Sequence, residues 1–545
     1  MFRSFLTLAL LAFSGLIFGQ GVNNGWTNWW GLKITEHAGE GWKDHQVLLN
    51  LDLESLVANG EIEPDGSDLR FSSDCDGAVS LTYWIEDGTF SDTTQVWVLL
   101  DTLAPNEEKF IYMFGGNPGV AAVSDFDATF DPATRLLVTT GTNYTPSMVE
   151  NWSWVEVEVG ATITVPENLV AGDTIVPHFY ARRFILNGDV ILNGAGGAGG
   201  TATGGNGNGT APGEGNQEGG GAGGGTGAAG MNGTDFGGGG VVAGGNPYPG
   251  GVPADTTIIA GSGGGGSLSG AGGAGGGAIK IHATVIEQNG DISANAVNGA
   301  DGADPLVIGL ELSGLPDASA GAGGGSGGGV VFLAREIKST GSINANGGNG
   351  GLGNNPGPPT TNSGGAGSGG IIKFFYERLI GGANRSVAGG SNSAASANAG
   401  EILDVQQAYF PSGELLEKIP YPIDYVFDIL NTDSLCKGVE YSHNAIFNSS
   451  VSRFDSIRFW VNSVPVLSDP FNSVFLYDGI EDGDEAYFTG EKYGCIQFSD
   501  TITFGVFDLP SATWEVADIV GETEYTFEVT ASTGNIGNQI WSFGD

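Results

Sequence analysis

Basic residues are scarce in this sequence. Of its 545 residues, 19 are Lys or Arg and 62 are Asp or Glu, so the formal net charge at pH 7 is −43. A field of this sign repels phosphate groups, and no basic cluster offsets it. We therefore expect neither nucleic acid nor anionic membrane surfaces as partners. The acidity favours solubility and the binding of divalent cations.

Long hydrophobic runs are missing after the first residues. The opening stretch, MFRSFLTLALLAFSGLIFGQ, places a basic residue before an apolar run from Phe5 to Phe18, followed by the small residue Gly19. This pattern predicts a secretory signal peptide over residues 1–19 and a mature chain that starts at Gln20. No later stretch has the ~20 apolar residues of a membrane helix, and no Cys follows the run to take a lipid. We expect a secreted, extracellular chain at a bacterial cell surface, without membrane insertion.

Motifs of catalytic and nucleotide-binding sites are missing as well. The five His are scattered without a metal-binding spacing such as H-E-x-x-H, and no G-x-x-x-x-G-K-[ST] phosphate loop is present. A G-x-S-x-G match at 323–327 lies in a glycine run without a strand-to-helix elbow. Paired carboxylates for glycoside hydrolysis stay open, because their pairing is spatial. We expect a protein that is not an enzyme and has no cofactor other than a Ca²⁺ ion.

Cysteine is limited to Cys75, Cys436 and Cys495. In an oxidising compartment two of the three can pair, which leaves one over. Cys75 has no partner within its own region. We expect it to be an inert buried thiol rather than a nucleophile, because no His lies near it in the sequence and acidic neighbours raise the pKa of a thiol.

Glycine is what the sequence has in quantity. Most of its 97 Gly fall between residues 181 and 400, whereas nearly all Trp lie outside that window. Two aromatic-rich regions therefore flank a glycine-rich middle, and the length predicts about three or four domains. The expected fold class is all-β and multidomain: an N-terminal β-sandwich, a glycine-rich repeat region of β-rungs with extended Gly segments, and C-terminal immunoglobulin-like sandwiches.

Strand patterns dominate residues 20–183. Segments such as HQVLLNLDL, LTYWIEDG, TQVWVLLDTL and KFIYMFGG combine alternation with β-branched and aromatic residues, and turn residues separate them. Their spacing predicts a β-sandwich. Two Asp/Gly turns, one in the segment DGSDLRF at 65–71 and one at 75–77, bracket a short strand that carries a charged pair.

These residues resemble a bacterial domain-of-unknown-function family that recurs on secreted and cell-surface proteins. The family's own function is uncharacterised, and its frequent neighbours are lectin-like sandwiches, which is an analogy rather than a mechanism. The resemblance is carried by the DGSDLRF motif and by the segments at 30–34, 83–86, 96–98, 111–112, 115–117 and 124–125.

Five residues of this region are candidates for ligand binding. Asp68 and Arg70, with Asp65 beside them, have the chemistry to contact a sugar or a cation, and Trp84 or Trp97 could serve as a stacking platform. The alternative is structural: the two Asp residues cap turns, Arg70 forms an ion pair and the Trp side chains fill the core.

A degenerate repeat runs through residues 184–400. The segment GGGAIKIHATVIEQNGDISANA is matched by GGGVVFLAREIKSTGSINANG, so the residue before the turn glycine, Asn289 or Thr340, recurs after 51 positions. Asn187, which begins a related segment, lies 102 positions before Asn289, and a third copy begins at Gly369 after a shorter interval. A featureless linker has no reason to keep such a register.

Each repeat carries an apolar strand, an Asn-Gly or Thr-Gly turn and a second short strand, which predicts a hairpin-like or solenoid rung. The long glycine runs between rungs are either flexible coils or packed extended helices, without the strict Gly-X-Y period of collagen. Because the apolar strands must be buried, we expect a rigid stalk. In composition the region resembles the glycine-rich parts of large bacterial surface proteins and of some phage-tail adhesins.

Residues 425–512 carry the markers of an immunoglobulin-type sandwich. Cys436 and Cys495 bracket Trp460, and Tyr493 lies two residues before the second Cys. In that fold an inter-sheet disulfide packs on a buried Trp, with a tyrosine corner before the second Cys. The segment resembles the immunoglobulin-like repeats of large secreted bacterial adhesins, which implies a Cys436–Cys495 disulfide.

One loop of this domain gathers carboxylates. Ca²⁺ prefers such a number of oxygen ligands, but the EF-hand spacing is missing. We therefore favour a solvated acidic turn, with a calcium site as the alternative. The candidate calcium ligands are Asp478, Glu481, Asp482, Asp484 and Glu485.

Two C-terminal segments remain. Residues 401–424 mix charged, apolar and Pro residues and are predicted to be a connector. Residues 513–545 end on WSFGD, which resembles the W-x-F-G-D-G signature of polycystic-kidney-disease-type repeats. Two strands cannot bury a core alone, so we expect this repeat to be incomplete and the natural chain to continue.

Three functions agree with these observations. The first is a non-catalytic structural adhesin, secreted or on the cell surface, whose stalk presents binding modules to cell-surface components. The second is a carbohydrate-binding protein that grips extracellular polysaccharide with its N-terminal sandwich. The third is the non-catalytic part of a larger secreted enzyme.

Overall fold

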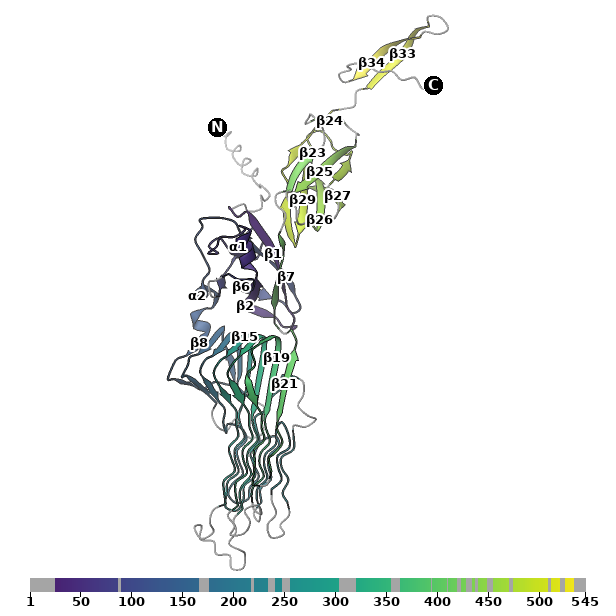
Figure 1. Cartoon of the computed structure of the whole chain (residues 1–545). Coiled ribbons are helices and arrows are strands. Elements are labelled where there is room, and N and C mark those ends of the chain that lie inside the picture. The colour runs from purple at the N-terminus through teal and green to yellow at the C-terminus, as the bar shows by residue number, and fades with distance from the viewer. Residues whose placement is uncertain are drawn as a thin grey trace, which may run out of the picture.

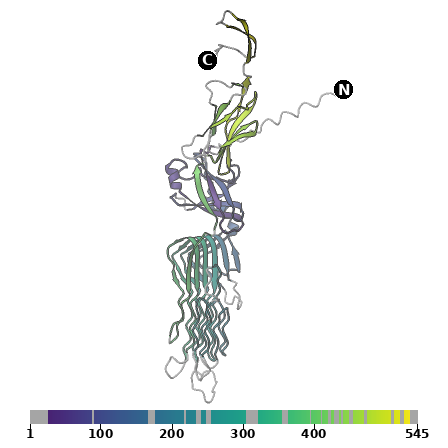
Figure 2. The same ribbon diagram turned by 90° about the vertical axis from the view of Figure 1, so that its right-hand side faces the viewer.

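The structure, a computed structural model, is an elongated molecule built almost entirely of β-strands (Figures 1 and 2). The expected all-β, multidomain fold class is confirmed. The predicted signal peptide lies outside the described residues, and within them no helix is long and apolar enough to cross a bilayer. The structure describes residues 25–86, 90–165, 176–216, 220–233, 241–247, 255–302, 320–353, 363–393, 395–408, 410–418, 423–427, 434–436, 440–447, 454–469, 474–507, 511–519 and 525–533.

The N-terminal sandwich packs a sheet of strand order β22-β1-β7-β3-β4 against a smaller sheet of order β2-β6-β5. Side chains from both sheets, such as Leu32, Val47, Val98 and Ile111, fill its core. A short helix, α1, follows β2 and is capped by the Asp52 carboxylate. The bounds are β1 Asn28–Thr35, β2 Trp42–Leu51, α1 Leu53–Ala58, β3 Arg70–Ser72, β4 Ser80–Leu81, β5 Tyr83–Ile85, β6 Thr94–Leu103, β7 Glu108–Gly115 and β22 Ser412–Lys418.

The outermost strand of this sandwich comes from the far side of the glycine region. β22 pairs antiparallel with β1, from Thr35 opposite Ser412 to Trp30 opposite Lys418. Without it, β1 would be an edge strand with unpaired backbone groups. Residues 401–424 are therefore not the predicted connector, because β21 (Glu401–Gln406) belongs to the next module and β22 to the N-terminal sandwich.

Parallel strands from β8 onward form a solenoid. The module predicted for residues 20–183 therefore ends earlier, because β8, β11 and β13 pair with solenoid strands. Its larger sheet has the order β21-β19-β17-β15-β13-β11-β8, with β10 also on β13, and its smaller sheet has the order β20-β18-β16-β14-β12-β9. Apolar residues of both sheets, such as Ile281, Phe332 and Ile343, fill the core between them.

The solenoid strands differ in length between the two sheets. The larger sheet contains β8 Arg135–Val138, β10 Val149–Asn151, β11 Trp154–Val157, β13 His178–Leu186, β15 Ala278–Gln288, β17 Gly329–Ser339, β19 Ile371–Ile380 and β21 Glu401–Gln406. The smaller sheet contains β9 Asn143–Tyr144, β12 Thr162–Thr164, β14 Asp189–Ile191, β16 Ile292–Ser293, β18 Ser342–Asn344 and β20 Asn384–Ser386. Short helical turns precede the first of these strands, α2 Phe126–Thr129 and η1 Pro132–Thr134.

The spacing of the sequence repeat is the register of the solenoid. Gln288 of β15 lies opposite Ser339 of β17, and Thr340 donates a hydrogen bond of 2.8 Å to Asn289 Oδ1, 51 residues earlier. Asn289 in turn donates to Asn187 Oδ1 over 3.0 Å and 102 residues. β13 and β15 are direct neighbours in the sheet. The interval of 102 residues therefore separates two consecutive rungs, which are joined by a longer stretch of chain than the other rungs. The rung is a solenoid rung rather than a hairpin.

The glycine runs between the rungs form a bundle of extended segments (Figure 1). Gly197 donates its backbone N–H to the carbonyl of Gly261 over 2.8 Å. Three residues later, Gly200 donates to Gly264 over the same distance. A period of three residues is that of a polyproline II helix, whose peptide groups make no bonds within the helix. Here the peptide groups of one segment form hydrogen bonds with those of the next segment. The segments are therefore packed against one another, as expected, and are not separate coils.

Glycine is required where these segments lie against one another. A Cβ atom on Gly264 would overlap the carbonyl oxygens of Gly323 and Gly324. Gly382, which follows β19 on the surface, has open space where its Cβ would be. Glycine in the bundle therefore has a structural role, because the absence of a Cβ atom lets neighbouring backbones come into direct contact.

A row of hydroxyl side chains crosses the bundle. Ser326 Oγ accepts the backbone N–H of Ser262 over 2.8 Å and lies 2.5 Å from Thr226 Oγ1. Ser368 Oγ accepts the backbone N–H of Thr226 over 3.0 Å. All four residues are fully buried. These small side chains accept hydrogen bonds from buried backbone N–H groups.

A C-terminal sandwich occupies residues 423–507, with Phe459, Phe475 and Phe488 in its core. The hairpin β33–β34 follows, and the WSFGD motif lies outside the described residues. The bounds are β23 Ile423–Phe427, β24 Ser434–Cys436, β25 Tyr441–Phe447, β26 Ser456–Val461, β27 Val464–Asp469, β28 Val474–Tyr477, β29 Glu485–Lys492, β30 Cys495–Phe498, β31 Ile502–Thr503, β32 Gly505–Phe507, β33 Ser511–Ile519 and β34 Tyr525–Thr533.

The substitution Gly264→Ala tests the packing of the bundle. We expect it to destabilise the bundle by about 1–3 kcal/mol, because the added methyl group forces two backbones apart. Gly382→Ala is the matched control and should change stability by less than about 0.5 kcal/mol. Hydrogen exchange of the bundle amides measures both effects. Equal exchange in the two variants would contradict close packing of these segments.

Candidate functional site

The DGSDLRF residues hold loops of the N-terminal sandwich together. Asp68 is fully buried, and its carboxylate accepts hydrogen bonds from the backbone N–H groups of Glu63 (2.8 Å) and Gly116 (2.6 Å). Asp65 accepts the N–H of Ser67 over 3.0 Å within the exposed turn. Both residues therefore cap loops. The ligand-binding role predicted for Asp68 is wrong, because its carboxylate is enclosed by the protein.

Arg70 is held by carbonyl groups. It donates to the backbone oxygens of Ser67 (2.8 Å), Leu69 (2.6 Å) and Ala121 (2.7 Å). Its guanidinium also lies over the ring of Trp26, 5.5 Å from the centroid. If Arg70 had a structural role, we expected it to form an ion pair. Among the described residues it instead makes these contacts with backbone carbonyl groups.

Trp84 and Trp97 lie where the N-terminal sandwich meets the solenoid. Trp97 is fully buried, donates through Nε1 to Glu86 over 2.9 Å and meets the Phe130 ring edge-on at 5.4 Å. Trp84 is half-buried and packs against Trp154 of β11, with ring centroids 6.0 Å apart. Trp97 cannot be the predicted sugar platform, and Trp84 contributes to the same junction.

Trp460 and Tyr493 do not take the roles predicted for them. Trp460 is half-buried and stacks on Tyr487 with centroids 5.9 Å apart. The adjacent Phe459 fills the core instead, because successive residues of a strand face opposite sides. Tyr493 is not a tyrosine corner: it lies in a left-handed turn (φ 53°), and its carbonyl accepts a 3.0 Å hydrogen bond from the hydroxyl of Tyr112 in the N-terminal sandwich.

The predicted Cys436–Cys495 disulfide is not formed. Cys495 has a free, fully buried thiol that packs with Trp29 and Tyr112 of the N-terminal sandwich and with Cys75. The reason is orientation: Cys495, at the start of β30, faces the neighbouring module rather than the core of its own sandwich. Cys436 lies on β24, which pairs with β32 in a separate sheet.

The acidic loop of the C-terminal sandwich uses its carboxylates to hold backbone. Asp484 accepts the N–H of Glu481 over 2.7 Å, and Asp482 accepts the N–H of Val506 over 3.0 Å. Within the described residues no group of three or more His, Cys, Asp or Glu side chains could hold a metal ion. The structure therefore favours an acidic turn over a calcium site built from Asp478, Glu481, Asp482, Asp484 and Glu485.

A buried junction joins the N-terminal sandwich to the solenoid. Arg183 of β13 lies between Glu86 of the sandwich, which it contacts as an ion pair, and Glu287 of β15, 2.8 Å away. Leu48 of β2 and Val285 of β15 pack in the same junction as the Trp97 ring. Losing one partner of a buried ion pair leaves a charge buried alone. The triad therefore holds the two modules in one orientation.

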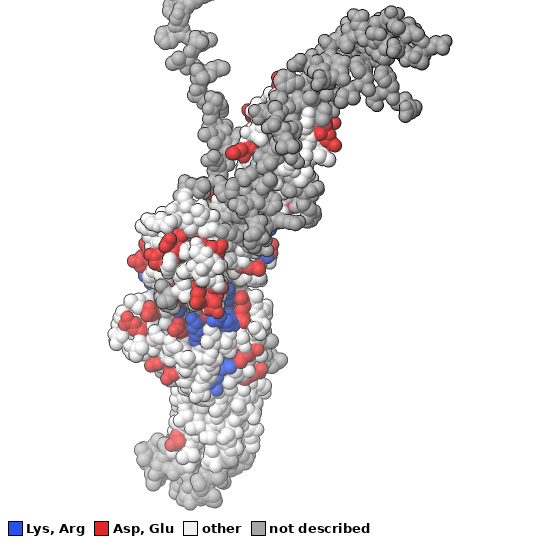
Figure 3. All heavy atoms as spheres, turned by 45° about the horizontal axis from the view of Figure 1, so that its top comes forward, with Lys and Arg blue, Asp and Glu red and all other residues white. Residues whose placement is uncertain are grey.

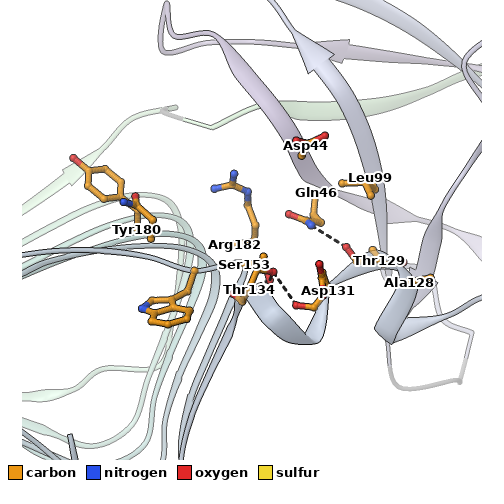
Figure 4. Close-up of a pocket in the computed structure, with 12 residues that line it drawn as sticks. Asp44, Gln46, Leu99, Ala128, Thr129, Asp131, Thr134, Ser153, Tyr180 and Arg182 are labelled. Atoms are coloured by element: carbon orange, nitrogen blue, oxygen red, sulfur yellow. Dashed lines mark hydrogen bonds between the residues drawn. The ribbon is translucent and has the colours of Figure 1, made fainter. Parts of the chain in front are cut away.

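A cleft of about 550 Å³ opens beside this junction (Figure 4). Residues of β2, β6, α2 and η1 line one side of it, and residues of β10 and β13 line the other. Figure 4 shows Arg182 extending from β13 into the space between Tyr180 and Gln46. The polar residues that line the cleft include Asp44, Gln46, Asp131, Asn151, Tyr180 and Arg182.

Two buried polar atoms in the cleft have no hydrogen-bond partner among the described residues, Nε of Arg182 and Oε1 of Gln46. The amide nitrogen of Gln46, by contrast, donates to the Thr129 carbonyl over 2.8 Å. Burial lowers the pKa of Arg182 to about 10, so the guanidinium stays charged at neutral pH. Because buried polar groups are normally paired, the cleft offers one donor and one acceptor to a ligand or to water.

The cleft carries charges of both signs. Figure 3 shows Lys and Arg side chains gathered between the sandwich and the solenoid, with acidic side chains around them and few charges on the bundle. Of the residues that line the cleft, Arg182 of β13 supplies the positive charge, while Asp44 and Asp131 supply carboxylates on the opposite side. Such a mixture suits a hydroxylated ligand, which can both donate and accept hydrogen bonds.

No local motif in the sequence predicts this cleft. Its residues come from strands on both sides of a module boundary, so no local motif marks them. The only trace is the pair Arg182–Arg183 in the strand HFYARRFIL. Two adjacent cations inside an apolar strand are unusual in a chain so poor in cations, and each needs a partner when buried.

Two half-buried imidazoles lie near the cleft. His178 of β13 and His282 of β15 stack with ring centroids 6.1 Å apart. Burial, together with the charge of Lys280, lowers the pKa of His178 to about 4. Burial is also the main reason that the pKa of His282 falls to about 3, and His178, Lys280 and Arg182 add to it. Both imidazoles are neutral at physiological pH.

Comparison with known proteins identifies part of the N-terminal sandwich. Residues 65–132 match a family described as a domain of unknown function, DUF2341. The match begins at the DGSDLRF motif and ends just before the solenoid. The search of curated proteins and the search of solved structures each found no match.

The low pKa values of these two half-buried imidazoles predict an acid-sensitive junction. An unfolded His takes up a proton near pH 6.5, whereas His178 and His282 resist it until about pH 4 and about pH 3. Their contribution to stability is therefore complete above pH 6.5 and is lost as the pH falls below it. The urea concentration at the midpoint of unfolding should therefore decrease as the pH is lowered from 7.5 to 5.

The variant His282→Phe should flatten this slope, because it removes one of the titrating groups. The control His37→Gln should leave the slope unchanged, since His37 is exposed. A wild-type midpoint that stays constant or rises over this range would contradict the prediction.

Proposed function

We propose that this chain is a non-catalytic structural and adhesion protein, secreted or held at a bacterial cell surface. Its glycine bundle is a stiff projection, and its sandwiches form the base that carries it. The signal-peptide pattern of residues 1–19 and the match to DUF2341 agree with this proposal. The partners would be extracellular polysaccharide or other cell-surface components.

The hydrogen-bonded packing of the glycine segments is the observation that carries this proposal, because packed segments form a stiff body.

The path of the chain indicates that this body is a projection. In a spacer the chain would enter at one end and leave at the other. Here both ends of the glycine region return to the N-terminal sandwich, because β22 pairs with β1. The bundle and the C-terminal sandwich lie at opposite ends of that sandwich (Figures 1 and 2). The bundle thus reaches away from the base instead of separating two modules.

Beads coated with the full chain test adhesion. We expect beads to be retained under flow on at least one of the following surfaces: bacterial cells, cellulose, chitin, alginate or mucin. The double variant Gly264→Ala/Gly323→Ala should lose most of this retention, because both substitutions insert a Cβ against neighbouring carbonyls. Beads coated with the Gly382→Ala protein should behave as the wild type.

Two outcomes would argue against a stiff adhesive projection. In one, wild-type beads are retained on none of these surfaces. In the other, the double variant adheres as well as the wild type although its bundle exchanges amide hydrogens faster.

The cleft supports a second function, carbohydrate binding at the junction of the N-terminal sandwich with the solenoid. Its unpaired Arg182 Nε and Gln46 Oε1 match the mixed donor and acceptor character of a sugar. Tyr180 and Trp152 add half-buried aromatic rings at its solenoid side. This site replaces the DGSDLRF residues as the location where the N-terminal module could grip a polysaccharide.

Titration with a panel of oligosaccharides tests the cleft. Arg182→Gln should weaken binding about 10- to 100-fold, because a hydrogen bond to a charged donor contributes about 1.5–3 kcal/mol. Lys109→Gln removes a cation from the surface of the same sandwich and should leave the affinity unchanged. Binding that survives Arg182→Gln, or no binding to any sugar, would exclude this role for the cleft.

A further inference from the structure

Two cysteines from distant parts of the sequence meet where the N-terminal and C-terminal sandwiches touch. Cys75 lies in the turn between β3 and β4, and Cys495 begins β30. They share one cluster with Trp29, Tyr112 and Phe114. The Cys495 side chain is fully buried and that of Cys75 is half-buried. The cluster brings the two thiols close enough that each influences the pKa of the other.

Both thiols are presented by well-defined turns. Asp74 holds the first turn, because its carboxylate accepts the backbone N–H groups of Ala78 (2.8 Å) and Val79 (2.9 Å). The second turn contains Tyr493 and Gly494 in left-handed conformations, with φ of 53° and 78°.

The contact between the modules is already built around these turns. The Tyr112 hydroxyl donates to the Tyr493 carbonyl over 3.0 Å, and the Tyr493 ring stacks on Phe110 with centroids 6.1 Å apart. Gly31 of β1 leaves room for that ring, since a Cβ there would lie 2.8 Å from it. The sandwiches therefore dock without a covalent bond, and a bond between the cysteines would make the docking permanent.

We propose that Cys75 and Cys495 form a disulfide that fastens the N-terminal sandwich to the C-terminal sandwich. The bond requires an oxidising compartment and a disulfide as oxidant, either a small molecule or a thiol oxidase. It does not depend on any ligand of the cleft or of the bundle. Cys436 is the cysteine left unpaired.

The chemistry proceeds by two exchanges. The Cys75 thiolate attacks one sulfur of the oxidant disulfide, forms a mixed disulfide and releases the first thiol. The Cys495 thiol then loses its proton, attacks the Cys75 sulfur and releases the second thiol. Two protein thiols are oxidised, the oxidant is reduced to two thiols, and the two protons end on those thiols.

The surroundings suit Cys75 to the first attack. Its pKa lies below the ordinary value because the Cys495 thiol donates a hydrogen bond to it, with a smaller contribution from the backbone N–H of Ile496. These contacts outweigh burial and the neighbouring Asp74 and Asp76, which act in the opposite direction. The expectation that acidic neighbours keep this thiol inert is therefore corrected. The pKa of Cys495 is raised, so it reacts second.

The experiment uses the full chain, purified in reduced form and then treated in its folded state with oxidised glutathione. Remaining thiols are alkylated in denaturant, the protein is cleaved at its many acidic residues, and peptides are identified by mass spectrometry without reductant. We expect a cross-linked peptide that contains Cys75 and Cys495, together with alkylated Cys436. In the reduced native protein, Cys75 should be alkylated faster than Cys495.

Two variants make the outcome specific. Cys436→Ser should keep the cross-link, and Cys75→Ser should abolish it and leave Cys495 as a thiol. A wild-type chain that yields a Cys436–Cys495 peptide would overturn the proposal. So would a folded wild-type chain in which Cys75 and Cys495 are both still alkylated after oxidation. Because the wild-type peptide map alone decides between these results, the test does not depend on the variants folding.

Discussion

The pairing of β22 with β1 is the contact on which the rest of the structure depends. It covers the edge of the N-terminal sandwich with a strand that the chain reaches only after the solenoid and the bundle are complete. The glycine region must therefore leave this sandwich and return to it, so it is a projection. The same pairing places the start of the C-terminal sandwich beside β1, where Tyr493 and Cys495 reach the aromatic cluster around Tyr112.

The bundle shows how a chain can pack with almost no side chains. In an ordinary core, apolar side chains interdigitate and the backbone bonds within its own elements. In the bundle, peptide groups of neighbouring segments bond directly, and Cβ atoms would collide with the facing carbonyls, as at Gly264. The few side chains inside are small, and the hydroxyls of Ser326 and Ser368 serve backbone donors. This gives an extended, nearly uncharged body attached to a strongly acidic base.

Two adjacent arginines of β13 have different surroundings at the junction between the N-terminal sandwich and the solenoid. Arg183 is enclosed by Glu86 and Glu287, whereas the adjacent Arg182 turns into the cleft, where its Nε finds no partner among the described residues. Adjacent residues of a strand face opposite sides, so one arginine lies in the interface and the other faces the cleft. Neither module alone contains the cleft, because its lining residues come from both.

The sequence by itself determined the all-β class, the DUF2341 segment and the 51-residue register, because alternation, local motifs and repeat spacing are properties of neighbouring residues. It could not assign Trp97, Cys495 or Tyr493, which look like a sugar platform, a core disulfide and a tyrosine corner. Only the tertiary structure decided that all three lie between modules. The physical reason is that a residue buried between two modules is of the same apolar or aromatic type as a residue buried in the core of one module. Which face meets a partner module depends on contacts between residues hundreds of positions apart.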